Sequence, residues 1–143
     1  MITCERYHDI SCGHRVVGHE GKCRHLHGHN YRIHFTCAAD ELDGVGRVVD
    51  FAVIKSLLCQ WLEDCWDHKF LAWQDDTVLA QKMPAEFVDS VVSVPFNPTA
   101  ENIARYLVDV VGPRQLAGTG VELVSCTVDE TRKCSATYTK GEA

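Results

Sequence analysis

The stretch KCRHLHGHNY, residues 22–31, organises the interpretation of the whole chain. It places Cys23 four residues before a His-Gly-His that is formed by His27 and His29. Because successive side chains of a strand point to opposite faces, the two histidines would project side by side. Two imidazoles presented in this way can bind one metal ion. An isolated His-x-His is more often a pair of ordinary polar residues at a strand end, so the motif alone does not decide the function.

The residues around this stretch alternate between apolar and polar side chains, as strands with one buried face do. A strand is predicted from about His27 to Ala38. Its apolar face carries His27, His29, Tyr31, Ile33, Phe35 and Cys37. Residues 3 to 14 alternate more loosely, which predicts an earlier strand that ends near His14. The clean alternation favours an antiparallel sheet with one face buried.

Helical periodicity occurs twice further along the chain. Asp50 is well placed to cap a helix over residues 51–66, in which apolar side chains recur at the spacing i, i+3, i+4 and i+7. Thr99 is expected to cap a second helix over roughly residues 100–111. The Gly-Pro at residues 112–113 is expected to stop that helix.

The remaining segments predict a turn and further strands. A turn is expected over residues 40–46, and the pattern allows a short strand at Val91–Val94. Two more strands are predicted, over residues 121–128 and 133–140. The principal order is therefore strand, strand, helix, helix, strand, strand. It predicts one α+β domain over residues 1–143, in which an antiparallel four-stranded sheet carries two helices on one face.

Composition excludes several classes of function. The chain of 143 residues carries a net charge of −6, which disfavours nucleic-acid binding because that depends on neutralising phosphates. No apolar run approaches the roughly 18 residues that a membrane span needs, so no membrane association is expected. The first residues lack the basic and apolar regions of a signal peptide, so a cytoplasmic protein is expected. A small anionic ligand remains possible, because Arg15, Lys22, Arg24 and His25 form a local basic cluster.

Cysteine is common in the sequence, with eight residues. No Cys-x-x-Cys pair occurs, which argues against a zinc ribbon or a thioredoxin-like redox site. Most of these cysteines are expected to be reduced and buried as small apolar residues. Cys23 differs from the others because it stands among charged and polar neighbours.

Three histidines are candidates for a metal site. If the first two strands are antiparallel neighbours, His14 at the end of one meets His27 and His29 at the start of the other. Three imidazoles with an open fourth position are the pattern of a catalytic zinc ion, which can act as a Lewis acid on a substrate oxygen. The chain holds eight histidines in all, so from spacing alone a chance grouping is about as plausible as a site.

Other candidate residues have two readings each. Cys23 is a base or nucleophile whose basic neighbours favour the thiolate, or an ordinary loop thiol. Asp67 and His68 form an acid–base pair, or a pair that is favourable at a helix end for electrostatic reasons. Glu130 anchors the N–H groups of a ligand, or is a solvated carboxylate at the end of a strand. The pattern alone does not choose between these readings.

The motifs taken together resemble the 6-pyruvoyl-tetrahydropterin synthase family. They are ISCGH at residues 10–14, Cys23 with His-Gly-His at 27–29, VDF at 49–51, Asp-His at 67–68, PTAEN at 98–102 and Glu-Thr at 130–131. They span nearly the whole chain in the right order. The gap of three residues between Cys23 and His27 is similar to the bacterial queuosine-pathway branch of the family, which forms 6-carboxytetrahydropterin, rather than to the animal pyruvoyl branch.

The resemblance implies a fold, a cofactor and a reaction. The fold would be the tunnelling fold (T-fold), a homo-oligomer, expected to be a hexamer, with active sites between subunits. The substrate would be 7,8-dihydroneopterin triphosphate, and the products carboxytetrahydropterin, acetaldehyde and triphosphate. Zinc would be held by His14, His27 and His29.

The same resemblance assigns the remaining roles. Cys23 would move a side-chain proton, with Asp67 and His68 completing the relay from a neighbouring subunit. Glu130 would anchor the pterin ring, and Thr99 and Glu101 would lie near the same pocket. The basic cluster adds one expectation of its own, that Lys22 and Arg24 receive the triphosphate.

Two departures from the family pattern stand out. The first motif usually carries a phenylalanine and two alanines before its histidine, whereas Ile10, Cys12 and Gly13 stand here. The segment over residues 72–84 has little that can be matched and could alter the mouth of the pocket. Two alternative functions stay open. They are a pyruvoyl-forming enzyme of the same family, and a zinc-binding protein that keeps the fold without the reaction.

Overall fold

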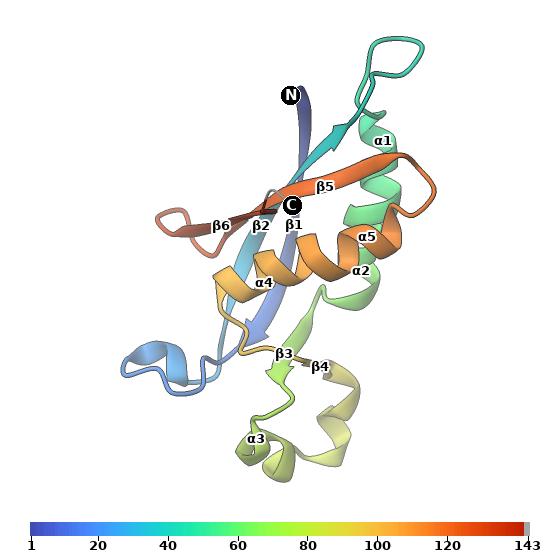
Figure 1. Ribbon diagram of the computed structural model, residues 1–143. Coiled ribbons are helices and arrows are strands. Elements are labelled where there is room, and N and C mark those ends of the chain that lie inside the picture. Colours follow the sequence, from blue (N-terminus) through green and yellow to red (C-terminus); the bar gives the residue numbers. More distant parts are fainter. Residues whose placement is uncertain (142–143) are drawn as a thin grey trace.

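A computed structural model describes residues 1–141 and shows a curled sheet with helices packed on it (Figure 1). The sheet has six strands in the order β4-β3-β1-β2-β5-β6. The strands are β1 Thr3–His14, β2 His27–Ala39, β3 Lys69–Trp73, β4 Val91–Val94, β5 Val121–Asp129 and β6 Ser135–Thr139.

The two long strands β1 and β2 form the centre of the sheet. They pair antiparallel without interruption, from Thr3 opposite Ala38 to His14 opposite His27. The alternation predicted from the sequence is confirmed, because Tyr31 and Ile33 are 1% exposed while Arg32 between them is exposed. Each such buried side chain contributes about 1.5–3 kcal/mol relative to its exposed state. The apolar face of this pair is therefore the floor of the hydrophobic core.

The α+β class is confirmed, and the predicted antiparallel four-stranded sheet is present, but the full sheet has six strands rather than four. The four predicted strands β1, β2, β5 and β6 are antiparallel neighbours. To these the structure adds β3, which pairs parallel to β1. The short strand that the sequence allowed at Val91–Val94 is present as β4 and pairs parallel to β3. At five residues β3 is too short to show a clear alternation. It begins directly after His68, whose φ of 62° turns the chain back from the preceding helix.

Two long helical segments cover the buried face of the sheet, as the sequence predicts. The first comprises α1 Phe51–Ile54, a π-helical turn η2 Lys55–Cys59 and α2 Gln60–Cys65. The second comprises α4 Ala100–Tyr106, a π-helical turn η4 Leu107–Val111 and α5 Gly112–Gln115. The predicted caps are present. Asp50 accepts from the backbone N–H of Ala52 at 2.9 Å, and Thr99 accepts from that of Asn102 at 3.1 Å.

The prediction that Gly112 and Pro113 stop the second helix is wrong, because the helix continues to Gln115. In the π-helical turn, the N–H of Gly112 donates to the carbonyl of Leu107, five residues earlier. This wider turn places Pro113 in the first turn of α5, where its missing N–H costs little. The Gln115 amide then donates at 2.9 Å to the Leu57 carbonyl in the π-helical turn of the first segment. The end of the second helical segment is thus linked to the π-helical turn of the first.

Gly112 allows the second helix to approach the sheet closely. A Cβ at this position would lie 2.9 Å from the Cβ of Leu123, which is 2% exposed on β5. We therefore expect Gly112→Ala to lower the free energy of unfolding by about 1–3 kcal/mol, the cost of overpacking a core. Urea titration followed by circular dichroism measures it. Gly44→Ala is the matched control, because a Cβ there meets nothing within 4 Å. Equal stability of the two variants would contradict the close approach.

Three short helical elements lie in the connections between strands. The 3-10 helix η1 Lys22–Arg24 lies in the connection between β1 and β2. Helix α3 Thr77–Lys82 and the 3-10 helix η3 Ala85–Ser90 lie between β3 and β4, at one end of the molecule (Figure 1). The sequence pattern showed neither of the last two, because this segment has no sustained periodicity. No helix among residues 1–141 is long and apolar enough to cross a membrane.

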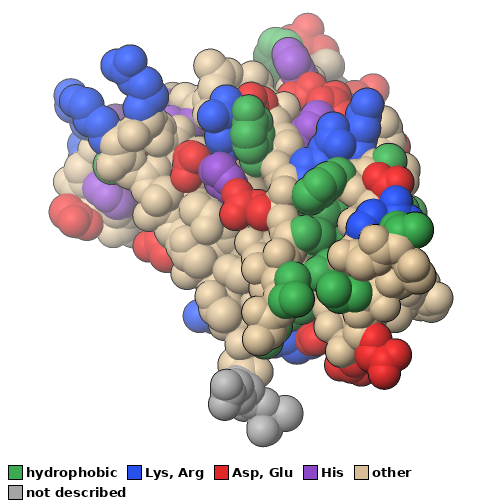
Figure 2. Space-filling model, turned by 90° about the horizontal axis from the view of Figure 1, so that it is seen from above, with side chains coloured by type: hydrophobic (Ala, Val, Ile, Leu, Met, Phe, Trp, Pro, Cys, Tyr) green, Lys and Arg blue, Asp and Glu red, His purple; other side chains and the backbone are tan. Residues whose placement is uncertain are grey.

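The surface carries charges of both signs. On the face seen from above, Lys and Arg side chains are interspersed with Asp and Glu, and histidines lie among them (Figure 2). This face is therefore mixed in charge, as is compatible with the net charge of −6.

Candidate metal centre and active site

The structure brings His14, His27 and His29 together where β1 ends and β2 begins. The ring centroids lie 4.5 Å (His14–His27), 5.1 Å (His14–His29) and 4.8 Å (His27–His29) apart. One nitrogen from each ring lies within 4.8 Å of the other two. The antiparallel register is the cause, because it sets His14 opposite His27 and Cys12 opposite His29. The three side chains consequently share the face of the sheet that packs against the helices.

Backbone carbonyls orient two of the three rings. Nδ1 of His14 donates to the Pro98 carbonyl at 2.6 Å, and Nδ1 of His27 donates to the His25 carbonyl at 2.7 Å. Each bond leaves Nε2 unprotonated and able to bind a metal, which is how second-shell partners fix metal-binding histidines in proteins. Nε2 of His14 lies 3.3 Å from the Tyr31 hydroxyl. The Tyr31 hydroxyl lies 3.1 Å from Nδ1 of His14 and further restricts the orientation of that ring.

The third ring supplies a separate sign of metal binding. Nε2 of His29 is buried and has no hydrogen-bond partner among the residues that the structure describes. It lies 3.3 Å from Oε1 of Glu130, without the geometry of a hydrogen bond. A buried polar atom without a partner is costly, and a bound cation would satisfy it. These three residues therefore fit a metal ion such as zinc.

The electrostatics favour the neutral imidazoles that metals require. Burial lowers the pKa of His14, although the hydrogen bond to the Pro98 carbonyl acts in the opposite direction. Burial also lowers the pKa of His29, against the opposing charge of Glu130. Both rings are thus held in the form that donates a lone pair.

Glu130 lies beside the same rings, and Cys23 lies in the connection between β1 and β2, whose ends carry them. Burial raises the pKa of Tyr31, and the charges of Glu130, Cys12 and Cys23 add to the effect, which places these groups within electrostatic range of the phenol. Cys23 is half-buried, and its carbonyl accepts from the Val16 N–H at 2.7 Å. The thiol therefore belongs to a loop that is attached to the end of β1, beside the three histidines.

Asp67 and His68 are brought together with each other. Nδ1 of His68 donates to Asp67 at 2.8 Å, and the other Asp67 oxygen accepts from the Ser11 N–H at 2.9 Å. Burial acts to raise the pKa of Asp67, but the bonds from Ser11 and His68 outweigh it and lower that pKa. The His68 ring is 80% exposed, so it is accessible to a group from outside the chain.

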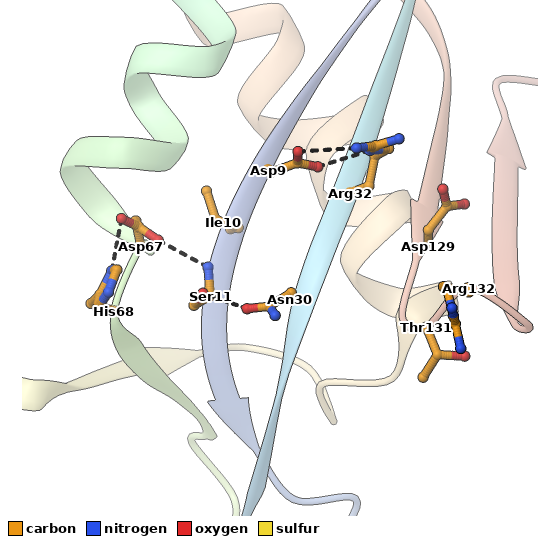
Figure 3. A pocket seen from close by; sticks show the side chains of 10 residues that line it. All are labelled: Asp9, Ile10, Ser11, Asn30, Arg32, Asp67, His68, Asp129, Thr131 and Arg132. Carbon is orange, nitrogen blue, oxygen red and sulfur yellow. Dashed lines mark hydrogen bonds and ion pairs between the residues drawn. The ribbon is translucent and has the colours of Figure 1, made fainter.

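This pair lies beside the polar face of the sheet. It lines a groove with a volume of about 680 Å³, together with Ser11 and Asn30, which alternate along β1 and β2 with the buried positions (Figure 3). A second hollow of about 510 Å³ borders His68 and the His27–His29 segment and includes Gly13 and Gly28. Among residues 1–141, no hydrogen bond joins Asp67 or His68 to the three histidines or to Cys23.

The remaining predicted site residues are Thr99, Glu101, Lys22 and Arg24. Thr99 caps α4 and adjoins Pro98, the residue whose carbonyl orients His14. Glu101 is exposed in the first turn of α4. In η1, Arg24 donates to the carbonyls of Glu20 and Gly21 at 3.2 Å each, so its guanidinium braces its own turn. Lys22 is exposed in the same turn.

Sequence reasoning missed several supporting groups. Tyr31 was visible as the next residue on the face of His27 and His29, and that spacing could have identified it. The Pro98 carbonyl is 84 residues from His14, and no local pattern could have revealed their contact. The same holds for the ion pair between Arg15 and Asp76, which are 61 residues apart.

Comparison with known proteins gives a consistent result. Residues 3–141 match the family described as 6-pyruvoyl tetrahydropterin synthase. The chain is 36% identical over 134 residues to the 6-carboxy-5,6,7,8-tetrahydropterin synthase of Rickettsia typhi, covering 94% of this chain and 97% of that one. It is 35% identical to the probable 6-carboxy-5,6,7,8-tetrahydropterin synthase of Halobacterium salinarum, covering 89% of this chain and 79% of that one.

Solved structures share the fold. An uncharacterized protein from Wolinella succinogenes superposes with a TM-score of 0.84 at 24% identity, over 98% of each chain. The 6-pyruvoyl tetrahydropterin synthase of Caenorhabditis elegans superposes with a TM-score of 0.68 at 26% identity, over 98% of this chain and 96% of that one.

Proposed function

We propose, because the chain belongs to the 6-pyruvoyl tetrahydropterin synthase family, that it is a zinc-dependent lyase acting on 7,8-dihydroneopterin triphosphate. The products would be 6-carboxy-5,6,7,8-tetrahydropterin, acetaldehyde and triphosphate. The observation that carries this proposal is the group of three histidines with the unpartnered Nε2 of His29, next to Cys23 and Glu130. The names of the relatives that match most of this chain favour the carboxy product.

The proposed roles follow from chemistry and position. His14, His27 and His29 would hold the zinc, which when bound supplies Lewis acidity toward a substrate oxygen. Cys23, in its loop beside these rings, would take a proton from the substrate side chain. Glu130 would accept hydrogen bonds from N–H groups of the pterin ring, since its carboxylate lies at the edge of the metal site.

The proton relay of Asp67 and His68 would come from a neighbouring subunit. This is supported by their place beside the polar face of the sheet and by the exposure of the His68 ring. We therefore propose a homo-oligomer, a hexamer in the T-fold arrangement, with sites between subunits. Thr99 and Glu101 would border the substrate pocket.

Lys22 and Arg24 would receive the triphosphate. Their turn contains Cys23. A triphosphate carries several negative charges, and basic side chains bind such a group. The hydrogen bonds of Arg24 to its own turn leave Lys22 as the more available of the two. The reaction would serve the synthesis of queuosine and related deazapurines in the cytoplasm.

Product analysis tests this proposal. Incubated with zinc and 7,8-dihydroneopterin triphosphate, the protein is expected to release acetaldehyde and a carboxypterin, which mass spectrometry identifies. A pterin that keeps its three side-chain carbons, without acetaldehyde, would instead identify the pyruvoyl-forming alternative. No turnover by a protein with full zinc content would favour a non-catalytic zinc-binding protein and contradict both enzyme assignments.

A further inference from the structure

Arg15 and Asp76 form an ion pair outside the set of groups described above. Nε of Arg15 donates to one carboxylate oxygen of Asp76 at 2.5 Å, and Nη2 donates to the other at 2.6 Å. The Asp76 side chain is 2% exposed and that of Arg15 24% exposed. Surface pairs usually contribute little to stability, but a two-point contact to a buried carboxylate fixes the geometry of both side chains.

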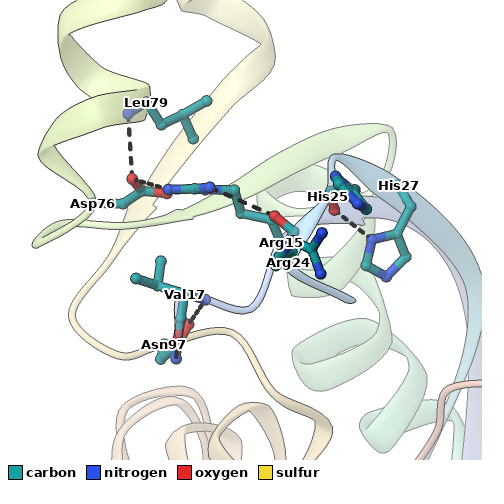
Figure 4. A network of polar contacts seen from close by, with 8 residues as sticks. All are labelled: Arg15, Val17, Arg24, His25, His27, Asp76, Leu79 and Asn97. Carbon is teal, nitrogen blue, oxygen red and sulfur yellow. Dashed lines mark hydrogen bonds and ion pairs between the residues drawn. The ribbon is translucent and has the colours of Figure 1, made fainter. Parts of the chain in front are cut away.

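This pair joins three segments that are distant in sequence. Asp76 also accepts from the Leu79 N–H at 3.2 Å and so caps α3. Arg15 follows the metal-site residue His14 directly, and its Nη1 lies 3.5 Å from the carbonyl of Arg24, the residue after Cys23 (Figure 4). The end of β1, the start of α3 and the Cys23 turn therefore meet at one guanidinium.

The Cys23 loop, residues 15–26, has few other attachments. The Val16 N–H donates to the Cys23 carbonyl at 2.7 Å, which closes the loop on itself. The amide of Asn97 holds Val17 through two bonds of 2.9 and 3.0 Å. Among the described residues, the Arg15 contact is the one that links the side of the loop next to Cys23 to the α3 segment. Its loss would remove this link to α3 and leave the Cys23 side held only by the Val16 bond and by the His25 carbonyl, which accepts from His27.

We propose that Arg15 and Asp76 are positioning residues for Cys23, through which the segment between β3 and β4 holds the thiol at the metal site. This inference rests on the proposed function for its effect on turnover, but its claim about position can be measured independently. Catalysis needs the reacting groups at a fixed distance, and a displacement of about 1 Å can cost roughly a hundredfold in rate. The segment over residues 72–84 has little that matches the family pattern. Through Asp76, this segment thus helps to position Cys23.

Asp76→Asn and Arg15→Lys test the inference in the zinc-loaded protein. The first keeps size and one cap acceptor but removes the charge. The second keeps the charge, so the buried carboxylate stays compensated and the variant remains informative if Asp76→Asn fails to fold. Asp75→Asn, the same change at the exposed neighbouring residue, is the matched control.

Four quantities are measured for each variant: zinc content, kcat, KM, and the rate at which iodoacetamide alkylates Cys23, which peptide mass spectrometry follows. We expect Asp76→Asn and Arg15→Lys to lower kcat by about tenfold to a hundredfold, with KM within about twofold and zinc retained. Cys23 is expected to react several-fold faster as its loop opens. Asp75→Asn is expected to match the parent protein.

Unchanged alkylation of Cys23 in both variants would overturn the inference, whatever happens to kcat, because the pair would then not hold the thiol. Faster alkylation with kcat at the parent level would overturn it too. Loss of zinc from Arg15→Lys would show that the pair supports the metal ligands instead. If the parent protein does not convert the pterin, the proposed function fails, while the alkylation rates still decide whether the pair positions Cys23.

Discussion

Cys23→Ala is expected to lower turnover of 7,8-dihydroneopterin triphosphate by about a hundredfold to ten-thousandfold, the range that general acid–base groups contribute. The thiol lies in the loop beside the three histidines and can accept a proton without being held by a metal. Its removal leaves those rings and their carbonyl partners untouched, since Cys23 contributes only its backbone carbonyl to the loop. Zinc content and KM are expected to stay close to those of the parent protein.

The measurement is product formation by mass spectrometry, combined with metal analysis of the same sample. Cys65→Ala serves as the matched control, because Cys65 is equally half-buried but lies on α2. A Cys23→Ala protein that turned over at the parent rate would remove Cys23 from the mechanism. That result would not bear on whether the three histidines bind zinc.

His29→Ala is expected to weaken zinc binding by more than about a hundredfold, since even the loss of a second-shell partner costs tenfold to a hundredfold. The parent protein at a zinc concentration of a hundred times Kd gains about 2.7 kcal/mol of stability by mass action. The variant is expected to gain almost nothing at that concentration. Its turnover should fall with its zinc content, and chelation of the parent should reproduce the loss.

A competition titration with a zinc-sensitive dye gives the affinity, and urea titration with and without zinc gives the stability. His25→Ala is the matched control. His25 lies two residues from His27, and the backbone carbonyl that orients His27 survives the substitution. Retention of full zinc by His29→Ala after dialysis against a chelator would contradict the site.

Local patterns were sufficient to predict that the three candidate metal ligands meet. The alternation of β1 and β2 predicted that His14, His27 and His29 share a face, and the register of the two strands confirms it. Their convergence needs only two neighbouring strands, so it could be predicted from short-range spacing. The helix caps at Asp50 and Thr99 were readable for the same reason.

The contacts that orient these residues could not be predicted from the sequence. The Pro98 carbonyl reaches His14 because α4 packs across the sheet, and nothing in the sequence near either residue specifies that packing. Strand β3 was missed because its pairing is parallel and five residues long. The helix end was misplaced at Pro113 because a π-helical turn, set by tertiary packing, accommodates the proline.

The position of Asp67 and His68 beside the polar face, away from the buried face that holds the three histidines, has a genetic consequence. If neighbouring subunits share the work, a substitution at His68 disables the site of another chain, whereas one at Cys23 disables the chain's own. Two alleles that are each inactive alone could then restore activity when co-expressed, because some mixed assemblies would contain one intact pairing. Dominance and complementation at this locus would therefore follow the two faces of one sheet.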